Sequence, residues 1–368
     1  MMWLIILALV LAASISGIVF LIKRFHSFSF IGKISSSNRK LSWFLAVLPI
    51  VLMILLSALL LNVWATMIIL IHLFVFWLVC ESAGKLIGKC LKKNVRPDIT
   101  GCAAILLTVI YLGIGWYLAH HVYRTSYSFT TDKKLGQEKL RIVEIADLHL
   151  GLTLDGEKFA EQCERINDEK PDAVIIAGDF VDDDSRRDDM LEACRALGGI
   201  NSTYGVYYII GNHDKSYYST RDFDLDEMYS EFEKYGINVL EDESVLVNDS
   251  FYIIGRKDAS DKDRLDMDKL TEGLDSTKYM ITVDHQPNDY ANEADAQVDL
   301  VLSGHTHGGH IFPAGQIGLL IGANDRVYGT EKRDNTNFVV TSGISGWAIP
   351  FKTGAISEYV VVDINEAK

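Results

Sequence analysis

Residues 299–310 have the sequence DLVLSGHTHGGH, in which a short apolar run ends in a cluster of glycine and histidine. Such a run is typical of a buried β-strand. Four more β-branched runs, over 140–146, 173–177, 206–210 and 279–283, end in the same way, in the sequences DLH, GDFVD, GNHD and DH. All histidines after residue 124 lie in these strand-end segments, namely His149, His213, His285, His305, His307 and His310. Because ligands gather at the carboxyl ends of strands in open α/β sheets, we expect a single site there.

Amphipathic segments separate several of these strands. Residues 156–170, 187–197 and 224–235 carry apolar side chains at helical spacing, and a further β-branched run covers 251–255. Strands that alternate with helices predict an α/β domain with parallel crossover connections.

Charge divides the chain into two unlike parts. The 368 residues include 35 Lys+Arg and 49 Asp+Glu, but residues 1–123 contain ten basic and only two acidic residues. The net charge is therefore +8 for the front part and −22 for the rest. An apolar, basic front and an acidic rear indicate separate domains. The acidity of the rear argues against nucleic acid as a partner, because binding to a phosphate backbone needs a basic surface.

The front part contains uncharged stretches that are long enough to cross a bilayer. Residues 2–22 and 102–119 each suit a hydrocarbon core of about 30 Å. Residues 41–80 are also uncharged, and a stretch of this length predicts two helices that fold back near residues 62–66. The predicted organisation is a four-helix transmembrane region over 1–123 with spans at about 2–22, 41–61, 64–80 and 102–119, a polar tether over 124–139, and a folded domain over 140–368.

The loops between the spans predict the orientation of the chain. Lys and Arg are concentrated in residues 23–40 and 81–101, and loops rich in these residues stay in the cytoplasm. We therefore expect a multi-pass protein of the cell membrane, with the lipid bilayer as a partner and the acidic domain on the extracytoplasmic face. A cleaved signal peptide over 2–22 is the alternative, disfavoured because no Lys or Arg precedes the apolar run. His72, within a span, is expected to be a neutral packed residue rather than a functional group.

The side chains at the strand ends suit a pair of divalent metal ions. Carboxylate, imidazole and amide oxygen together bind ions such as Mn²⁺, Fe²⁺ or Zn²⁺, whereas structural zinc sites usually contain thiolates. The neighbouring glycines permit tight turns. Two ions about 3.5–4 Å apart stabilise an in-line displacement at phosphorus.

The order of the motifs D-x-H, G-D-x-x-D, G-N-H-D, H and G-H-x-H resembles that of the calcineurin-like metallophosphoesterase superfamily. With its predicted spans, the chain looks like the bacterial transmembrane proteins that carry a metallophosphoesterase domain. The resemblance covers roughly residues 138–365. It implies a four-layer αββα sandwich, in which two mixed sheets lie face to face between helices and the metals lie at one edge.

The resemblance also implies a role for most of the strand-end residues. The cofactors would be two divalent ions (Mn, Fe or Zn). The first ion would be held by Asp147, His149, Asp179 and His307. The second would be held by Asp179 as a shared ligand, with Asn212, His285 and His305.

His213 is implied to be the catalytic residue, which stabilises the transition state and protonates the leaving oxygen. An imidazole suits this role because its pKa lies near neutral pH. Asp182 and Asp214 are expected to orient the loop and His213. His310 departs from the family pattern, in which a Gln usually follows the Gly-Gly pair. Two alternatives stay open for His310, a contact with substrate or a solvent-exposed position in the loop.

We expect the protein to be a membrane-anchored phosphoesterase that hydrolyses phosphodiester or diphosphate bonds through a metal-bridging hydroxide. Membrane-associated substrates, among them lipid-linked ones, are favoured because the spans hold the site near the bilayer. The alternatives are the same chemistry on soluble nucleotides or cyclic nucleotides, and a hydrolase of the UDP-diacylglucosamine type. A non-catalytic metal-binding membrane scaffold is disfavoured, because it would leave His213 without a role.

A long loop follows the last motif. Residues 309–329 are rich in glycine and apolar side chains, and a loop beside a catalytic motif is expected to shape the pocket. Two alternatives stay open for its apolar side chains, contact with lipid or packing on the domain itself.

Overall fold

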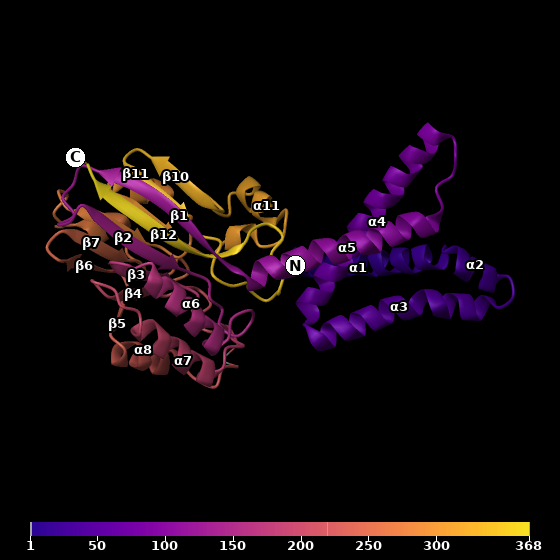
Figure 1. Cartoon of the computed structure of the whole chain (residues 1–368), viewed down its shortest axis with the longest axis horizontal. Helices are drawn as coiled ribbons and strands as arrows, with labels where there is room; N and C mark the ends of the chain where they lie inside the picture. The colour runs from indigo at the N-terminus through magenta and orange to yellow at the C-terminus, as the bar shows by residue number, and fades with distance from the viewer. Residues whose placement is uncertain (1, 219, 368) are drawn as a thin grey trace. The chain divides into compact units, whose positions relative to one another are not determined.

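The computed structural model describes residues 2–218 and 220–367, with side chains from Ser14 onward. The chain forms two compact units, Met1–Gly115 and Trp116–Lys368 (Figure 1).

The first unit is helical. Its elements are α1 (Met2–His26), α2 (Ser29–Ser35), α3 (Arg39–Leu60), α4 (Val63–Leu91) and α5 (Pro97–His120), the last of which continues into the second unit. Among the described residues, α3, α4 and α5 are long and apolar enough to cross a membrane. A fourth span results if Ser14–His26 and Ser29–Ser35, which are bent by 80°, are counted together. The structure thus supports three or four spans where the sequence analysis predicted four.

Helices α3 and α4 are separated at Leu61 and Asn62, within the region 41–80 that was predicted to fold back on itself. The Asn62 side chain accepts a hydrogen bond of 2.7 Å from the backbone N–H of Ala65 and so caps the start of α4. The ring of the buried His72 lies beside Tyr111, and its Nδ1 is 2.8 Å from the carbonyl of Ile68 in the same helix. These contacts agree with a packed role for His72.

The second unit contains two six-stranded sheets. The first has the order β1 (Val122–Thr131), β12 (Ser357–Glu366), β2 (Lys139–Ile145), β3 (Ala173–Ala177), β4 (Val206–Ile209) and β5 (Ile237–Val239). The second has the order β10 (Gly329–Arg333), β11 (Thr336–Val340), β9 (Leu300–Ser303), β8 (Tyr279–Val283), β7 (Phe251–Gly255) and β6 (Glu243–Val247). Both sheets are mixed, since β2–β3–β4–β5 and β7–β8–β9–β11 are parallel, whereas β12–β2, β6–β7 and β10–β11 are antiparallel.

The two sheets pack face to face, and helices cover their outer faces. Alternate residues of each strand point to opposite faces, so Ile142 of β2 and Ile281 of β8 meet between the sheets, whereas Val143 packs under helices. The helices on the first sheet are α6 (Gly156–Asp168), α7 (Arg187–Gly198) and α8 (Leu225–Lys234). The helices on the second are α9 (Met267–Thr271) and α10 (Tyr290–Asp295). The predicted four-layer αββα sandwich is confirmed.

The structure differs from the expected tether over 124–139. Residues up to Thr131 form β1, an edge strand that pairs in parallel with β12 from Val122 opposite Ser357 to Thr131 opposite Glu366. The Ser- and Thr-rich composition suggested a linker, but Tyr127 and Phe129, two residues apart, pack on the core between the sheets. This alternation at a period of two is what makes the segment a strand.

Candidate metal centre

The strand-end residues of both sheets come together at one edge of the second unit. Hydrogen bonds connect the two sheets there. Nδ1 of His285, after β8, donates to the carbonyl of Ala177 in β3 at 2.8 Å. The backbone N–H of His305, after β9, donates to Oδ1 of Asp147, after β2, at 2.9 Å. Residues that are far apart in the sequence therefore share one site.

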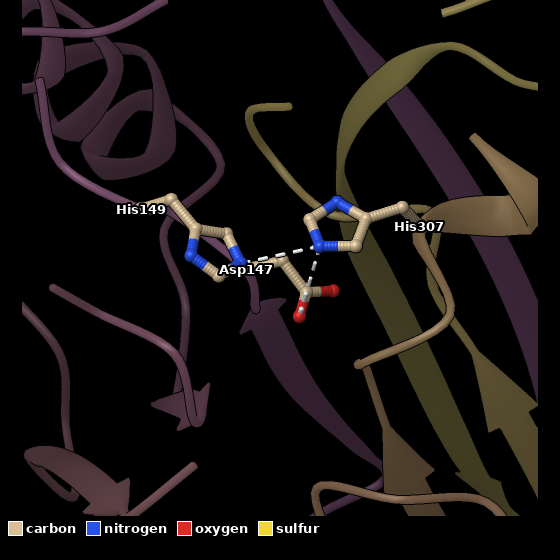
Figure 2. A group of neighbouring side chains, drawn as sticks. All are labelled: Asp147, His149 and His307. Atoms are coloured by element: carbon tan, nitrogen blue, oxygen red, sulfur yellow. Dashed lines mark hydrogen bonds and ion pairs between the residues drawn. The ribbon is translucent and has the colours of Figure 1, made fainter. Parts of the chain in front are cut away.

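One group of ligand atoms is formed by Asp147, His149 and His307, whose ligand atoms lie within 4.8 Å of one another. Figure 2 shows the rings of His149 and His307 pointing toward each other above the carboxylate of Asp147. Their Nε2 atoms are 3.1 Å apart, and Nε2 of His149 is 3.5 Å from Oδ2 of Asp179. Asp147 Oδ2 is buried without a hydrogen-bond partner among the described residues. Lone pairs that face one another in this way fit a shared cation.

A second group is formed by Asp179, His285 and His305. Oδ2 of Asp179 lies 3.1 Å from Nε2 of His285. The amide oxygen of Asn212 is 3.2 Å from the same nitrogen and 3.0 Å from Nδ1 of His305. Because Nδ1 of His285 is engaged with Ala177, its Nε2 is available as a ligand atom. Asp179 lies in reach of both groups, and its oxygen and nitrogen neighbours suit a divalent ion.

The electrostatics of the site favour positive charge close to the Asp179 carboxylate. Burial raises the pKa of Asp179, but the imidazoles of His285 and His149 outweigh this effect and hold it well below its usual range. Burial lowers the pKa of His285, and the carboxylates of Asp179 and Asp147 outweigh it and raise the value to about 10. The residues therefore fit metal ions, which would supply the charge that the imidazoles otherwise provide as protons.

The ligand loops have strained backbones. Six of the candidate residues have a positive φ although they are not glycine, namely Asp147, His149, Asp179, His305, His307 and His310. Such strain is common at functional sites. The close approach of loops also requires glycine, because a Cβ on Gly211 would lie 2.2 Å from Oδ1 of Asp179 and one on Gly343 would lie 2.6 Å from Cβ of Asp147.

His213 lies beside the first group, and its ring is half-buried. Its Nδ1 is 3.2 Å from Oδ1 of Asp182, whose other oxygen is 3.1 Å from Nδ1 of His149. Burial lowers the pKa of His213, but Asp182 and Asp179 outweigh burial and raise it. One carboxylate therefore orients both the predicted catalytic imidazole and a predicted ligand.

Asp214 fixes the backbone rather than the His213 ring. Its Oδ2 accepts hydrogen bonds from the N–H groups of Asp179 and Gly211, at 2.8 and 2.7 Å, and its Oδ1 accepts from Val181 at 3.0 Å. The loops after β3 and β4 are thus tied to each other. The role of each residue toward a particular ion stays a prediction.

His310 is half-buried, so the solvent-exposed alternative does not describe it. Its ring is stacked on that of His307, with a centroid distance of 5.3 Å and an interplanar angle of 24°. Burial lowers the pKa of His310 to about 3. The stacking supports the position of the candidate ligand His307, and a contact of His310 with substrate stays a prediction.

The sequence analysis missed two aromatic side chains at the site. The rings of Trp347 and Tyr217 lie 5.0 and 5.2 Å from that of His213, and both are exposed in part. Trp347 belongs to the loop after β11, another strand that ends at this edge. The strand-end pattern could have revealed this loop, but the loop begins with Thr-Ser-Gly, whereas the recognised motifs contain Asp or His.

The comparisons with known proteins agree with this geometry. The family model for calcineurin-like phosphoesterase matches residues 140–309, which contain all the motifs described above. An uncharacterized metallophosphoesterase of Aquifex aeolicus is 31% identical over 268 residues, which cover 70% of this chain and 98% of the relative. A transmembrane protein with metallophosphoesterase domain of Bos taurus is 26% identical, over 77% of this chain and 66% of the relative.

Among solved structures, the protein TT1561 of Thermus thermophilus matches 55% of this chain and 88% of its own, with a TM-score of 0.36 and 12% identity. The family model and the near-complete coverage of the Aquifex aeolicus relative decide the assignment. The chain belongs to the calcineurin-like metallophosphoesterase family and is a metal-dependent phosphoesterase with apolar N-terminal helices.

Proposed function

We propose that this protein is a membrane-anchored phosphoesterase that uses two divalent ions to hydrolyse phosphodiester or diphosphate bonds in membrane-associated substrates. The observation that carries the proposal is the pair of adjacent ligand groups on either side of Asp179, which lies 3.5 Å from His149 and 3.1 Å from His285. A carboxylate in this position suits a ligand shared by two ions.

In this proposal Asp147, His149, Asp179 and His307 would hold one ion, and Asp179, Asn212, His285 and His305 would hold the other. When bound, such a pair supplies Lewis acidity and a nucleophile at neutral pH. The chain itself holds the imidazole rings in fixed orientations. Ala177 fixes the ring of His285, and Asp182 fixes that of His149, so that their Nε2 atoms face inward.

His213 is proposed to transfer a proton to the leaving oxygen. Its Nδ1 donates to Asp182, so Nε2 is the nitrogen that can present a proton to a substrate. Its backbone N–H donates to Asp179 at 2.8 Å, which keeps it beside the shared carboxylate. A non-catalytic scaffold would not need an oriented imidazole that is absent from the proposed ligands.

The catalytic domain is proposed to lie on the extracytoplasmic face of the cell membrane, with four spans before it. The support is the concentration of Lys and Arg in residues 23–40 and 81–101. This orientation disfavours a substrate of the UDP-diacylglucosamine type, which would be cytoplasmic. A reporter fused to the C-terminus tests the orientation, and reporter activity in the cytoplasm would contradict it.

A substrate panel on the metal-reconstituted full chain tests the function. We expect hydrolysis of phospholipids or lipid diphosphates in addition to aryl phosphodiesters. Activity confined to soluble nucleotides or cyclic nucleotides would favour that alternative, and no hydrolysis of any phosphoester would overturn the proposal.

The substitution His213→Ala tests the mechanism. We expect it to lower turnover by roughly 10²- to 10⁴-fold, because general acid catalysis contributes about that much. Metal content measured by elemental analysis should not change. The exposed His121 offers a matched control, since His121→Ala should leave both quantities unaffected. Normal turnover in His213→Ala would remove the assigned role.

A further inference from the structure

The segment that follows His307 presents an uncharged apolar surface. Residues 307–324 contain no Asp, Glu, Lys or Arg. Helix α11 (Ala314–Leu320) lies in this segment. Five large apolar side chains are exposed here, Phe312 (54%), Ile317 (51%), Leu319 (46%), Leu320 (86%) and Ile321 (72%). A patch of this kind is unusual on a surface that faces only water.

This apolar loop, defined as residues 310–321, is held in place from one side. A Cβ on Gly309 would lie 2.8 Å from Cα of Gly315, so the two backbones are in contact. Gly315 is buried and also packs against Val327. Because this side of α11 rests on the domain, its apolar side chains are fixed in an outward position. With 46–86% of their surface exposed, the five side chains are not packed into the core of the domain, which favours contact with lipid.

The apolar loop lies at the end of the second unit where the chain enters from α5. The hydroxyl of Ser357, at the start of β12, donates to the carbonyl of Ala119 at 2.8 Å, and Ser357 pairs with Val122, the first residue of β1. Three residues before Ser357, the N–H of Gly354 donates to the carbonyl of His310 at 3.0 Å. Figure 1 shows α11 and the start of β1 at the same end of the domain.

The helix that leads into this end is long and apolar enough to span a membrane. Helix α5 ends at His120, and β1 begins at Val122, so no linker separates the two. A bilayer crossed by α5 must therefore have its surface close to Ala119. The apolar loop and the metal centre share this end, because the loop begins at His310, which is stacked on the ligand candidate His307.

We propose that the apolar loop inserts into the surface of the bilayer and brings lipid-borne phosphoesters to the metal centre. An interfacial segment needs apolar side chains to bury and few charges to desolvate, and both conditions are met here. This inference rests on the proposed function and narrows its substrate class to lipids that carry a phosphoester in their head group.

Photo-labelling of the full chain in bilayers tests the insertion without any measurement of activity. The bilayers contain a phospholipid with a diazirine in its acyl chain, and labelled peptides are identified by mass spectrometry. We expect label on residues 310–321 and, as a positive control, on the exposed face of α3 at Leu55 and Leu56. Strand β6, which is far from α11 in Figure 1, should stay unlabelled although Val245 and Leu246 are exposed.

Either of two results would overturn the inference. The first is label on α3 without label on the apolar loop. The second is a chemical cross-link from the loop of one chain to another chain, which would identify a second copy of the protein as the occupant.

A pair of variants tests the consequence for substrates. Leu320→Asp with Ile321→Asp should reduce hydrolysis of a bilayer phosphoester lipid by roughly tenfold or more, because each buried apolar side chain contributes about that factor. Hydrolysis of a water-soluble aryl phosphodiester should stay within about twofold. The matched control, Val245→Asp with Leu246→Asp on β6, should leave both activities unchanged.

The outcomes separate this inference from the proposed function. Equal losses on both substrates in the loop variant would overturn the docking role. A wild-type chain that hydrolyses no phosphoester would overturn the proposed function, and the labelling result would still decide whether the loop enters the bilayer.

Discussion

Two neighbouring clusters of buried charge in the second unit differ in the source of their positive charge. In the Arg256 network, Nη1 of Arg256 lies 2.8 Å from Oδ2 of Asp284 and 3.3 Å from Oε1 of Glu293. Its Nη2 lies 2.9 Å from Asp289, and Arg264 also bonds Asp284. The candidate metal centre begins one residue later, at His285. There the carboxylates of Asp147 and Asp179 face imidazoles and backbone amides.

The two clusters differ in whether protein side chains or, as proposed, bound ions compensate the charge of the carboxylates. Buried carboxylates require compensation, and in the Arg256 network guanidinium groups provide it permanently. In the candidate metal centre, the proposed ligand atoms form no hydrogen bond or ion pair with a guanidinium group of the described residues, so that a divalent ion can take that place. The network also anchors Asp284 and hence the position of His285.

The largest expected effect comes from Asp179→Asn, which removes the carboxylate between the two ligand groups. We expect turnover to fall by roughly 10³-fold or more, because metal-ion catalysis is worth several kcal/mol. Elemental analysis should show less bound metal. Asp263→Asn is a suitable control, since Asp263 is exposed and pairs with Lys257 at the surface. Full metal content and turnover in Asp179→Asn would refute the role of a shared ligand.

Arg256→Met tests the other cluster. Loss of the guanidinium leaves buried Asp284 and Glu293 without their partner, and we expect the free energy of unfolding to fall by about 3–5 kcal/mol. Chemical denaturation of the detergent-solubilised protein measures it. Arg195, in an exposed pair with Glu192, provides the control, because Arg195→Met should cost about 1 kcal/mol or less. Similar values for the two variants would show that the network is not a structural anchor.

Asp182→Asn weakens the orientation of His149 and His213 without removing a proposed ligand. We expect turnover to drop by roughly 10- to 100-fold, the usual cost of losing a partner that orients a metal ligand. Metal content should fall less than in Asp179→Asn. Asp184, in the same acidic run but exposed, is the matched position, and Asp184→Asn should behave as wild type. A loss of metal as complete as in Asp179→Asn would instead make Asp182 a ligand.

Glu144→Met has the smallest expected effect and extends the comparison to a buried carboxyl that forms no ion pair among the described residues. Glu144 is buried in β2, and neither carboxyl oxygen has a hydrogen-bond partner among the described residues. Burial, with Glu358 nearby, raises the pKa of Glu144 well above its usual value. The folded state therefore binds this proton more tightly than the unfolded state, so stability decreases as pH rises above about 4.5.

The substitution Glu144→Met should increase the free energy of unfolding at pH 8 by about 1–2 kcal/mol, because it removes an unpaired buried polar group. It should also flatten the decrease above pH 4.5. Unfolding measured from pH 4 to pH 8 checks both expectations, with the exposed Glu161→Met as control. A variant with an unchanged pH profile would mean that Glu144 is compensated in the native protein.

The sequence alone predicted much of the fold and most of the side chains that the structure brings together in the candidate site. The runs at 173–177, 251–255 and 279–283 coincide with β3, β7 and β8, and the amphipathic segments coincide with α6, α7 and α8. These elements have strong local patterns, since a buried strand and an amphipathic helix each repeat at a fixed period. Of the strands that were missed, β1, β5, β6 and β10 are edge strands, whereas β11 and β12 lie inside their sheets.

The motifs determined which side chains are available for metal ions, because each motif carries its ligand types and its glycines within a few residues. Only the tertiary structure decided which of them meet. The distances from Asp179 to His149 and His285 join segments separated by 30 and 106 residues, and no local pattern encodes such a contact.

Local sequence patterns likewise could not predict the contact of Trp347 with His213, the Arg256 network next to His285, or the place of the apolar loop at the end where α5 enters. Each depends on how two sheets pack and where loops from both converge. Local propensity does not fix that packing, since it results from the burial of the whole core.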